Sequence, residues 1–286
     1  MARQVVIENP VVNSPFGEPQ RHFRFDDEGI TDQVVEGRRE SGYFVPIAQP
    51  RKKAGGAKQL VFDTEWTADR IEPNKTVNAI RRKVGIWREG RYWGDTTSVT
   101  ARLLEHWRDP ARSRRLFFCQ IEAMETLIYI AEVARKYGDN SIENDLRQAN
   151  DDANPGLFRI AAKMATGSGK TVVMAMLIAW QTLNKIANPQ DSRFTDRFLV
   201  VTPGITIRDR LRVLLPSDPG NYYRALDIVP ADLMDRLGQA KIIITNFHAF
   251  KRREKVKAGK LTKDILGNDD PARGAAFTES EGEMVR

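Results

Sequence analysis

The sequence has little cysteine or histidine and no long hydrophobic run. Cys119 is the single cysteine, so the chain can form no internal disulfide and suits a reducing compartment. The three histidines, His22, His106 and His248, are widely separated, and this argues against a zinc site. The longest apolar run, at 172–180, is too short to span a bilayer, and the first 15 residues lack the apolar core of a signal peptide. We therefore expect a cytoplasmic protein with no membrane segment.

Composition places the chain among ordinary globular proteins. It has 286 residues, of which 41% are hydrophobic and 29% charged, so it can bury a real core and has room for two domains. Its 45 Lys and Arg against 38 Asp and Glu give a net charge of +7. A basic balance of this size is compatible with binding to nucleic acid and equally with a solvated basic surface that binds nothing.

Residues 1–110 are predicted to form an N-terminal arm and accessory region. The first 60 residues are rich in Pro, Gly and charge, with short β-prone pieces such as "GYFVPIA". Two short helices are expected between about 75 and 110, the second capped by Thr100 and ended by Pro110. Four tryptophans lie here among Arg and Lys, which leaves open a surface that stacks on single-stranded nucleic acid or a simple core role. They are Trp66, Trp87, Trp93 and Trp107.

Residues 111–286 are predicted to form an α/β domain. A long amphipathic helix is expected first, with an apolar stripe that includes a buried Cys119, ended by Gly138; a polar, Asn-rich bridge follows to residue 156. Strands and helices then alternate, which favours a parallel sheet with helices on both faces. The expected strands are 157–164, "RFLVVT" and "KIIITN", and the expected helices are 170–187, 205–214 and 230–238.

The segment "ATGSGKT", residues 165–171, is typical of a loop that binds phosphate between a strand and a helix. Gly167 and Gly169 allow the backbone N–H groups to approach an anion closely, and the dipole of the following helix adds attraction. Lys170 would reach the β- and γ-phosphates as the catalytic cation, and the Thr171 hydroxyl would bind Mg²⁺. Thr166 and Ser168 complete the cofactor-binding residues. The strict pattern has glycine where this chain has Met164.

The neighbouring motifs carry a family resemblance. "MATGSGKT", "FLVVTPGITIRDRL" and "IIITNFHAF" resemble motifs I, Ia and Ib of superfamily 2 DEAD/DEAH-box helicases, in particular the Res subunit of type III restriction enzymes, where methionine before the loop is familiar. "LFFCQIEAMETLIYI" resembles the helix before the first strand of these proteins. The resemblance implies a P-loop RecA-like parallel sheet, here an incomplete first helicase lobe. It also implies ATP and Mg²⁺ as cofactors, and DNA and a modification methyltransferase subunit as partners.

The same resemblance assigns roles outside the loop. Gln120 matches the glutamine that reads adenine, and the alternative is an exposed helical glutamine. Four residues on loops after strands would hold a nucleic-acid backbone, and the alternative for each is a turn or helix cap. They are Thr202, Pro203 and Arg208 in motif Ia and Thr245 in motif Ib.

The carboxylates that complete such a site are not found. The superfamily places a D-E-x-[HD] element after four apolar residues, and neither "GNDDPARG" at 267–274 nor "QLVFDTEW" at 59–66 fits. We therefore expect the N-terminal part of a longer helicase and restriction endonuclease, able to bind ATP but without substantial hydrolysis of its own. Two alternatives stay open: a phosphate-loop ATPase that does not act on DNA, and a stand-alone nucleotide-binding or DNA-binding module.

Overall fold

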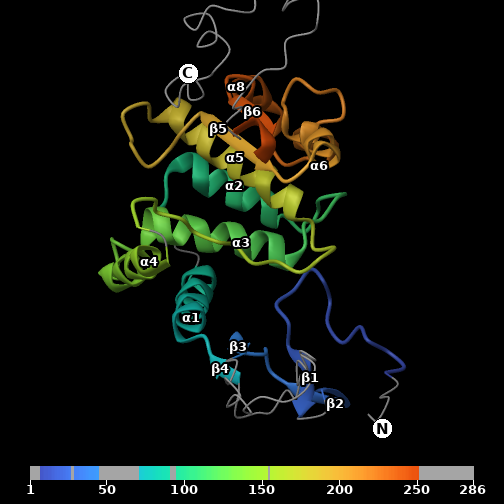
Figure 1. The fold of residues 1–286 in the computed structure, drawn as a ribbon. Helices are drawn as coiled ribbons and strands as arrows, with labels where there is room; N and C mark the ends of the chain where they lie inside the picture. Colours follow the sequence, from blue (N-terminus) through green and yellow to red (C-terminus); the bar gives the residue numbers. More distant parts are fainter. Residues whose placement is uncertain (1–6, 27–28, 45–70, 91–94, 154, 251–286) are drawn as a thin grey trace, which may run out of the picture.

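The computed structural model describes residues 7–26, 29–44, 71–90, 95–153 and 155–250. Figure 1 shows the N-terminal arm at one end, a helical layer in the middle, and the elements after the phosphate loop at the other end. One hydrophobic core joins the helices, with buried residues from Ile80 to Leu237. The division at residues 110 and 111 stays a prediction.

The described residues of the arm include two small antiparallel sheets. β1 pairs with β2 in a hairpin, and β3 pairs with β4. The Asn13 side chain shapes the turn before β1, because its oxygen accepts from Gln20 N and Arg21 N at 2.8 and 3.0 Å. The strands are β1 (Arg21–Asp26), β2 (Gly29–Glu36), β3 (Gly42–Phe44) and β4 (Ile71–Pro73).

Helices α1 (Lys75–Glu89) and α2 (Ser98–Arg108) confirm the two helices expected in this region. The prediction that Thr100 caps α2 is wrong: Thr97 is the N-cap, and its hydroxyl accepts from Thr100 N at 3.1 Å. Thr100 lies buried one turn later, where its own hydroxyl donates to Glu132 at 2.7 Å. Two hydroxyls spaced three residues apart look alike as caps in a sequence, and burial decides between them.

Two of the four tryptophans are core residues. Trp87 is 3% exposed and Trp107 is 1% exposed. The indole N–H of Trp107 donates to Ile228 O at 2.8 Å, which joins α2 to the last third of the chain. The stacking interpretation is therefore wrong for both, while Trp66 and Trp93 lie outside the described residues.

The long helix is α3 (Phe118–Ile128), which continues in a π-helical turn, Tyr129–Val133. Its buried face differs from the predicted stripe: Ile121, Met124, Glu125 and Ile128 are buried, whereas Cys119 is exposed. The prediction of a buried thiol is wrong because carboxylates occupy part of the buried face. The spacing of apolar residues along a helix cannot reveal a carboxylate that is buried with cationic partners.

The polar, Asn-rich bridge, for which the sequence predicted no secondary structure, is helix α4 (Asn140–Ala153). Only Ile142 of α4 is buried. The helix gains support from pairs one turn apart, Glu143 with Arg147 at 2.7 Å and Gln148 with Asp152 at 2.9 Å. Such pairs leave almost no hydrophobic period for a sequence reading to detect.

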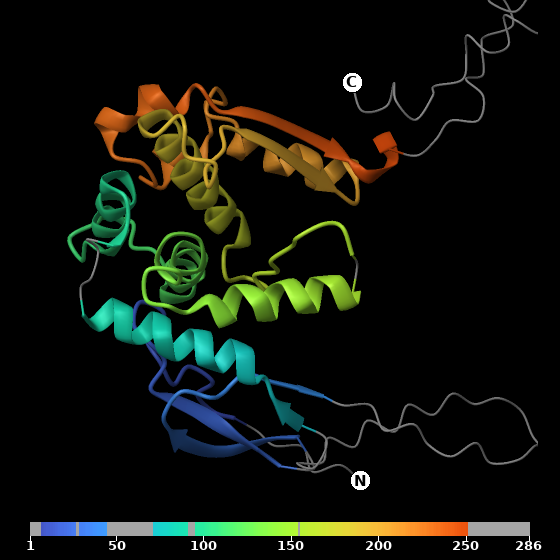
Figure 2. The same ribbon diagram turned by 90° about the vertical axis from the view of Figure 1, so that its left-hand side faces the viewer.

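The elements after the loop confirm most of the predicted order (Figure 2). β5 and β6 pair in parallel, from Arg197 opposite Lys241 to Thr202 opposite Asn246. Short 3-10 turns extend α6, precede α8 and follow β6. The elements are α5 (Lys170–Ala187), β5 (Arg197–Thr202), α6 (Ile205–Arg210), α7 (Tyr222–Ala225), α8 (Met234–Leu237) and β6 (Lys241–Asn246).

The strand predicted at 157–164 is not formed. Leu157, Phe158 and Ile160 are exposed, and the Asn150 side chain, not a neighbouring strand, binds the backbone N–H and C=O of Arg159 at 2.8 and 2.9 Å. A strand needs a neighbour for its backbone groups, and in the described part of the chain β5 has a partner on one edge only.

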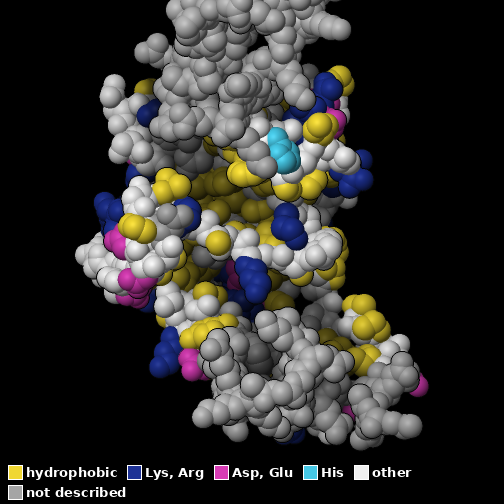
Figure 3. Space-filling model, in the orientation of Figure 1, with side chains coloured by type: hydrophobic (Ala, Val, Ile, Leu, Met, Phe, Trp, Pro, Cys, Tyr) yellow, Lys and Arg dark blue, Asp and Glu magenta, His cyan; other side chains and the backbone are white. Residues whose placement is uncertain are grey.

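Among the described residues, the core packs against one face of the parallel pair only. Phe198, Ile242 and Ile244 pack against the core, whereas Leu199 and Ile243 are 58% and 64% exposed. Figure 3 shows hydrophobic side chains gathered across the middle of the molecule at the level of α5. The prediction of helices on both faces is therefore wrong for the described residues. The fold is mixed α/β with a two-stranded parallel pair. No helix in the described ranges is long and apolar enough to cross a membrane.

Candidate functional site: the phosphate loop

The loop "ATGSGKT" leads directly into α5, which begins at Lys170. Gly167 and Gly169 have φ angles of +82° and +79°, in the left-handed region that favours glycine. Gly169 is also tightly enclosed, because a Cβ built on it would lie 2.3 Å from Gln120 Nε2. The left-handed conformation therefore favours glycine at 169, and an added methyl group would also have to displace the end of the Gln120 side chain.

At the N-terminus of α5 the backbone N–H groups of Lys170 and Thr171 have no acceptor among the described residues, whereas Val172 N donates to Gly169 O at 2.9 Å. The first N–H groups of an α-helix have no acceptor within the helix, and the N-cap Gly169 has no side chain to supply one. These N–H groups and the helix dipole attract an anion. The local geometry therefore fits a phosphate group at the start of α5.

Lys170 is folded back over its own loop. Its ammonium group donates to the carbonyl oxygens of Met164 and Ala165, at 3.2 and 2.9 Å, and its side chain is exposed. These acceptors are neutral, whereas hydrogen bonds to an ionised acceptor are about twice as strong. A phosphate bound in the loop would therefore replace the two carbonyl oxygens as the hydrogen-bond acceptor of the Lys170 ammonium.

The hydroxyl residues of the loop differ in their surroundings. Ser168 Oγ donates to Ala165 O at 2.7 Å, which closes the loop turn, while Thr166 is exposed. Thr171 lies half-buried in the first turn of α5, directly after Lys170. Of the three, Thr171 has the helical position from which a hydroxyl could reach a metal ion beside the phosphates.

Gln120 joins α3 to the phosphate loop. Its side chain is 4% exposed; its oxygen accepts from Phe117 N at 3.0 Å, and its nitrogen donates to Ser168 O at 3.0 Å. The alternative of an exposed helical glutamine is therefore wrong. A carboxamide has two N–H groups and two lone pairs, so one of each remains for a ligand. Contact with adenine stays a prediction.

Cys119 lies beside the same carbonyl. Its sulfur is 3.9 Å from Ser168 O, and partial burial raises the pKa of its thiol. The thiol nevertheless has enough exposure to react with a reagent in solution. The single cysteine therefore lies next to the phosphate loop.

The motif Ia and Ib residues meet where β5 and β6 end. Thr202 is 2% exposed, and its hydroxyl lies 3.0 Å from Gly204 O and 3.3 Å from Thr245 O. Pro203 is exposed just after it. The hydroxyl of Thr202 therefore stabilises the junction of the two strands within the protein, and any contact with nucleic acid falls to the residues around it.

Arg208 lies one turn into α6. Its Nε and Nη2 atoms are 3.0 and 2.9 Å from Asp209 Oδ1, so the neighbouring carboxylate partly neutralises its charge. Thr202 is the last residue of β5 and Thr245 lies within β6, so the prediction that they lie on loops after the strands is wrong for both. Pro203 and Arg208 follow β5, and Arg208 is paired inside the protein. The role of all four residues in binding stays a prediction.

Two carboxylates of α3 have structural roles that the sequence did not predict. Glu125 is fully buried between Arg88 and Arg108, at 2.8 and 2.7 Å. Glu122 pairs with Arg38 of the arm. Acidic residues in an otherwise apolar helix are a signal of internal ion pairs, but the sequence does not name their partners.

The acidic residues considered as Mg²⁺ ligands lie in segments 59–66 and 267–274, and both segments fall entirely outside the described residues. In the described part of the chain, no group of three or more His, Cys, Asp or Glu is placed to hold a metal ion. Among the described residues, Thr171 is the Mg²⁺ ligand that the sequence predicts.

A family model described as "Type III restriction enzyme, res subunit" matches residues 115–271, more than half of the chain. The match includes Gln120, the phosphate loop, and both strands of the parallel pair. No curated protein matches the chain, and no solved structure matches it. The chain therefore belongs to the family of type III restriction enzyme res subunits.

Proposed function

We propose that the phosphate loop binds ATP with Mg²⁺, and that the chain is the ATP-binding part of a DNA helicase or translocase of a type III restriction enzyme. The observation that carries the proposal is the geometry at the start of α5. Gly167 and Gly169 adopt left-handed backbone conformations in the loop, and the Lys170 ammonium lies over it. Gln120 of α3 contacts the same loop from the side.

Each loop residue then has a specific task. Lys170 would exchange the Met164 and Ala165 carbonyls for β- and γ-phosphate oxygens, gaining charge-assisted hydrogen bonds. Thr171 would supply a hydroxyl ligand to Mg²⁺, which neutralises phosphate charge when bound. Gln120 would use its remaining N–H and lone pair on the adenine edge. The sequence contains no D-E-x-[HD] element, so the function proposed for these 286 residues is binding, not turnover.

DNA is the proposed partner of the surface where β5 and β6 end. Thr202, Pro203 and Thr245 come together there, and Arg208 follows on α6. Ligands bind preferentially at the carboxyl ends of parallel strands, and phosphate contacts position a protein on nucleic acid without reading sequence. Binding would require Arg208 to exchange Asp209 for a DNA phosphate. A modification methyltransferase subunit is the proposed protein partner.

Titration with a fluorescent ATP analogue in the presence of Mg²⁺ tests the nucleotide site. We expect saturable binding that Lys170→Ala weakens at least about tenfold, since a charge-assisted contact is lost. Lys163→Ala is the matched control, because Lys163 is an exposed lysine just before the loop. Equal affinity of the Lys170 variant and the unchanged chain would show that the nucleotide does not bind at this loop.

A salt titration of DNA binding tests the second surface. Phosphate contacts make affinity fall with salt, with a slope of about 0.9 per contact on duplex DNA. Arg208→Ala should reduce this slope, whereas Arg236→Ala, which removes an equal charge from α8, should leave it unchanged. Equal slopes for the two variants would remove Arg208 from the interface.

A further inference from the structure

The N-terminal arm meets α3 at its first turn, beside Gln120. The N-cap residue of α3 is Phe117, whose side chain cannot accept a hydrogen bond. The arm supplies the missing acceptor, because Phe118 N donates to Pro15 O at 2.8 Å. The Phe16 ring also lies 5.8 Å from the Phe117 ring. The arm thus caps the helix that carries Gln120.

Arg38 anchors the arm one turn further along α3. Its two terminal nitrogens each lie 2.6 Å from one oxygen of Glu122, a bidentate pair. Its guanidinium also lies over the Phe118 ring, 5.6 Å from the centroid, while Arg88 lies over the same ring at 4.9 Å. Glu18 of the arm joins both arginines, at 3.0 and 3.1 Å.

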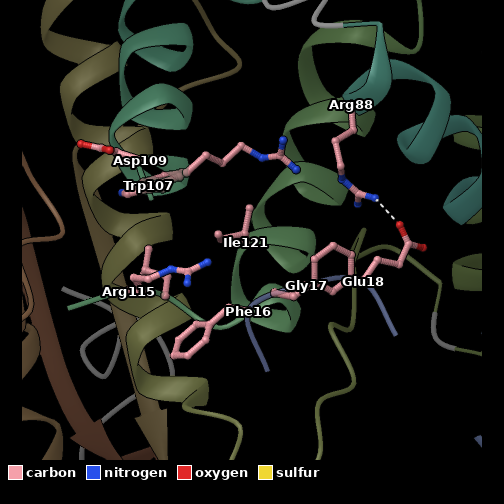
Figure 4. Close-up of a pocket in the computed structure, with 11 residues that line it drawn as sticks. Phe16, Gly17, Glu18, Arg88, Trp107, Asp109, Arg115 and Ile121 are labelled. Carbon is pink, nitrogen blue, oxygen red and sulfur yellow. Dashed lines mark hydrogen bonds and ion pairs between the residues drawn. The ribbon is translucent and has the colours of Figure 1, made fainter. Parts of the chain in front are cut away.

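The contact between arm and helices is mainly polar. No side chain that the structure describes in residues 7–44 is buried. A cavity of about 320 Å³ remains between the arm and the ends of the helices. Figure 4 shows Phe16, Gly17 and Glu18 along this cavity, with Arg115 and Arg88 facing it. The arm is therefore held by ion pairs, ring contacts and backbone hydrogen bonds, with little apolar burial to fix it.

We propose that the arm is a positioning element for the phosphate loop, and that Arg38 is the positioning residue that anchors it. The proposal rests on the nucleotide binding proposed above. Arg38 holds Phe118 and Glu122, which lie on either side of Gln120, and Gln120 holds Ser168. With the arm docked, the first turn of α3 is capped and the Gln120 amide stays against the loop.

Release of the arm has a predictable effect on affinity. The first turn of α3 loses the Pro15 acceptor and the Arg38 pair, so it opens more often. Gln120 then holds the loop for a smaller fraction of the time. Apparent affinity falls in proportion to the fraction of molecules in the binding-competent state. The arm therefore affects nucleotide affinity without touching the nucleotide.

The test compares variants at the anchor in the 286-residue chain, with the fluorescent ATP analogue and Mg²⁺. Arg38→Ala should weaken binding about tenfold, within the usual range of coupling between sites. Arg38→Lys keeps the charge but loses the bidentate pair, so an intermediate affinity is expected. The exchange Arg38→Glu with Glu122→Arg restores opposite charges at the two positions but sets the new Glu beside Glu18 and the new Arg beside Arg88, so part of the affinity should return. Arg21→Ala is the control, because Arg21 pairs with Glu36 inside the arm.

A second measurement does not depend on nucleotide. The rate at which a maleimide labels Cys119 should rise severalfold in Arg38→Ala and stay unchanged in Arg21→Ala. Unchanged labelling together with unchanged nucleotide affinity in Arg38→Ala would overturn the proposal. If Lys170→Ala binds the nucleotide normally, the proposed function fails, and the labelling rates still decide whether the arm positions α3. If circular dichroism shows Arg38→Ala unfolded, Arg38→Lys and the charge exchange decide by both measurements.

Discussion

The side-chain nitrogen of Gln120 lies 3.0 Å from the carbonyl oxygen of Ser168, so a helix upstream of the phosphate loop holds the loop directly. Gln120→Ala removes this bond and the proposed adenine contact. A hydrogen bond contributes about 1 kcal/mol, so we expect ATP affinity to fall at least about fivefold. Selectivity for ATP over GTP should fall with it. Gln148→Ala on α4 is the control. Unchanged ATP affinity and selectivity in the Gln120 variant would contradict the assignment.

Gly169 is expected to tolerate no side chain. Its φ of +79° strains any other residue, and an added Cβ would displace the Gln120 side chain from its bond to Ser168. Gly169→Ala should therefore abolish measurable binding of the ATP analogue. Gly85→Ala, with open space around the new methyl group inside α1, should preserve binding and stabilise the fold by about 0.5–1 kcal/mol. The two results together distinguish a loop effect from a general cost of added methyl groups.

Glu125 should be critical for stability. It is fully buried between two guanidinium groups, and its removal leaves Arg88 and Arg108 facing each other without a carboxylate. Breaking a buried pair of this kind costs about 3–5 kcal/mol, so Glu125→Gln should lower the free energy of unfolding by about that amount. Glu143→Gln on the exposed face of α4 should cost less than about 1 kcal/mol. Urea titration measures both, and similar costs would contradict the prediction.

The contact between the arm and α3 should weaken in acid. Burial acts to raise the pKa of Glu122, but the Arg38 hydrogen bond and the charges of Arg38, Arg88 and Arg81 outweigh it and hold the pKa below its ordinary value. Glu18 also forms ion pairs with Arg38 and Arg88. A carboxyl pKa lowered by folding gives stability that is present above the ordinary carboxyl pKa and is lost as pH falls through the folded value.

We therefore expect thermal stability to fall more steeply below pH 4.5 in the unchanged chain than in Glu122→Gln, which has no carboxyl group to protonate at this position. Melting temperatures measured in steps from pH 6 to pH 3 give the comparison. Parallel curves for the two proteins would show that Glu122 contributes no such stability.

Local sequence signals predicted the elements that they specify strongly. The apolar pattern of α5 and the short apolar runs of β5 and β6 depend on near neighbours along the chain, and all three form where expected. The glycine and lysine spacing of the loop also predicted its position before α5. The left-handed φ angles of Gly167 and Gly169 confirm the conformational reason for those glycines.

Features that depend on distant partners could not be predicted in this way. The pair between Arg38 and Glu122 joins residues 84 positions apart, and no sequence pattern assigns a role to either residue. The exposure of Cys119 follows from which face of α3 the buried carboxylates take. Residues 157–164 carry a strand-like pattern, but a strand forms only where a neighbouring backbone is present. In each case the missing information is tertiary.

The face of β5 and β6 that no described residue covers has a practical consequence for work in solution. Leu199, Val201 and Ile243 place large aliphatic side chains in water on one side of a parallel pair. Exposed apolar surface of this kind promotes self-association. A dye that fluoresces on apolar surfaces should bind the purified chain, and light scattering should grow with protein concentration, so binding constants for this chain are best measured at low micromolar concentration.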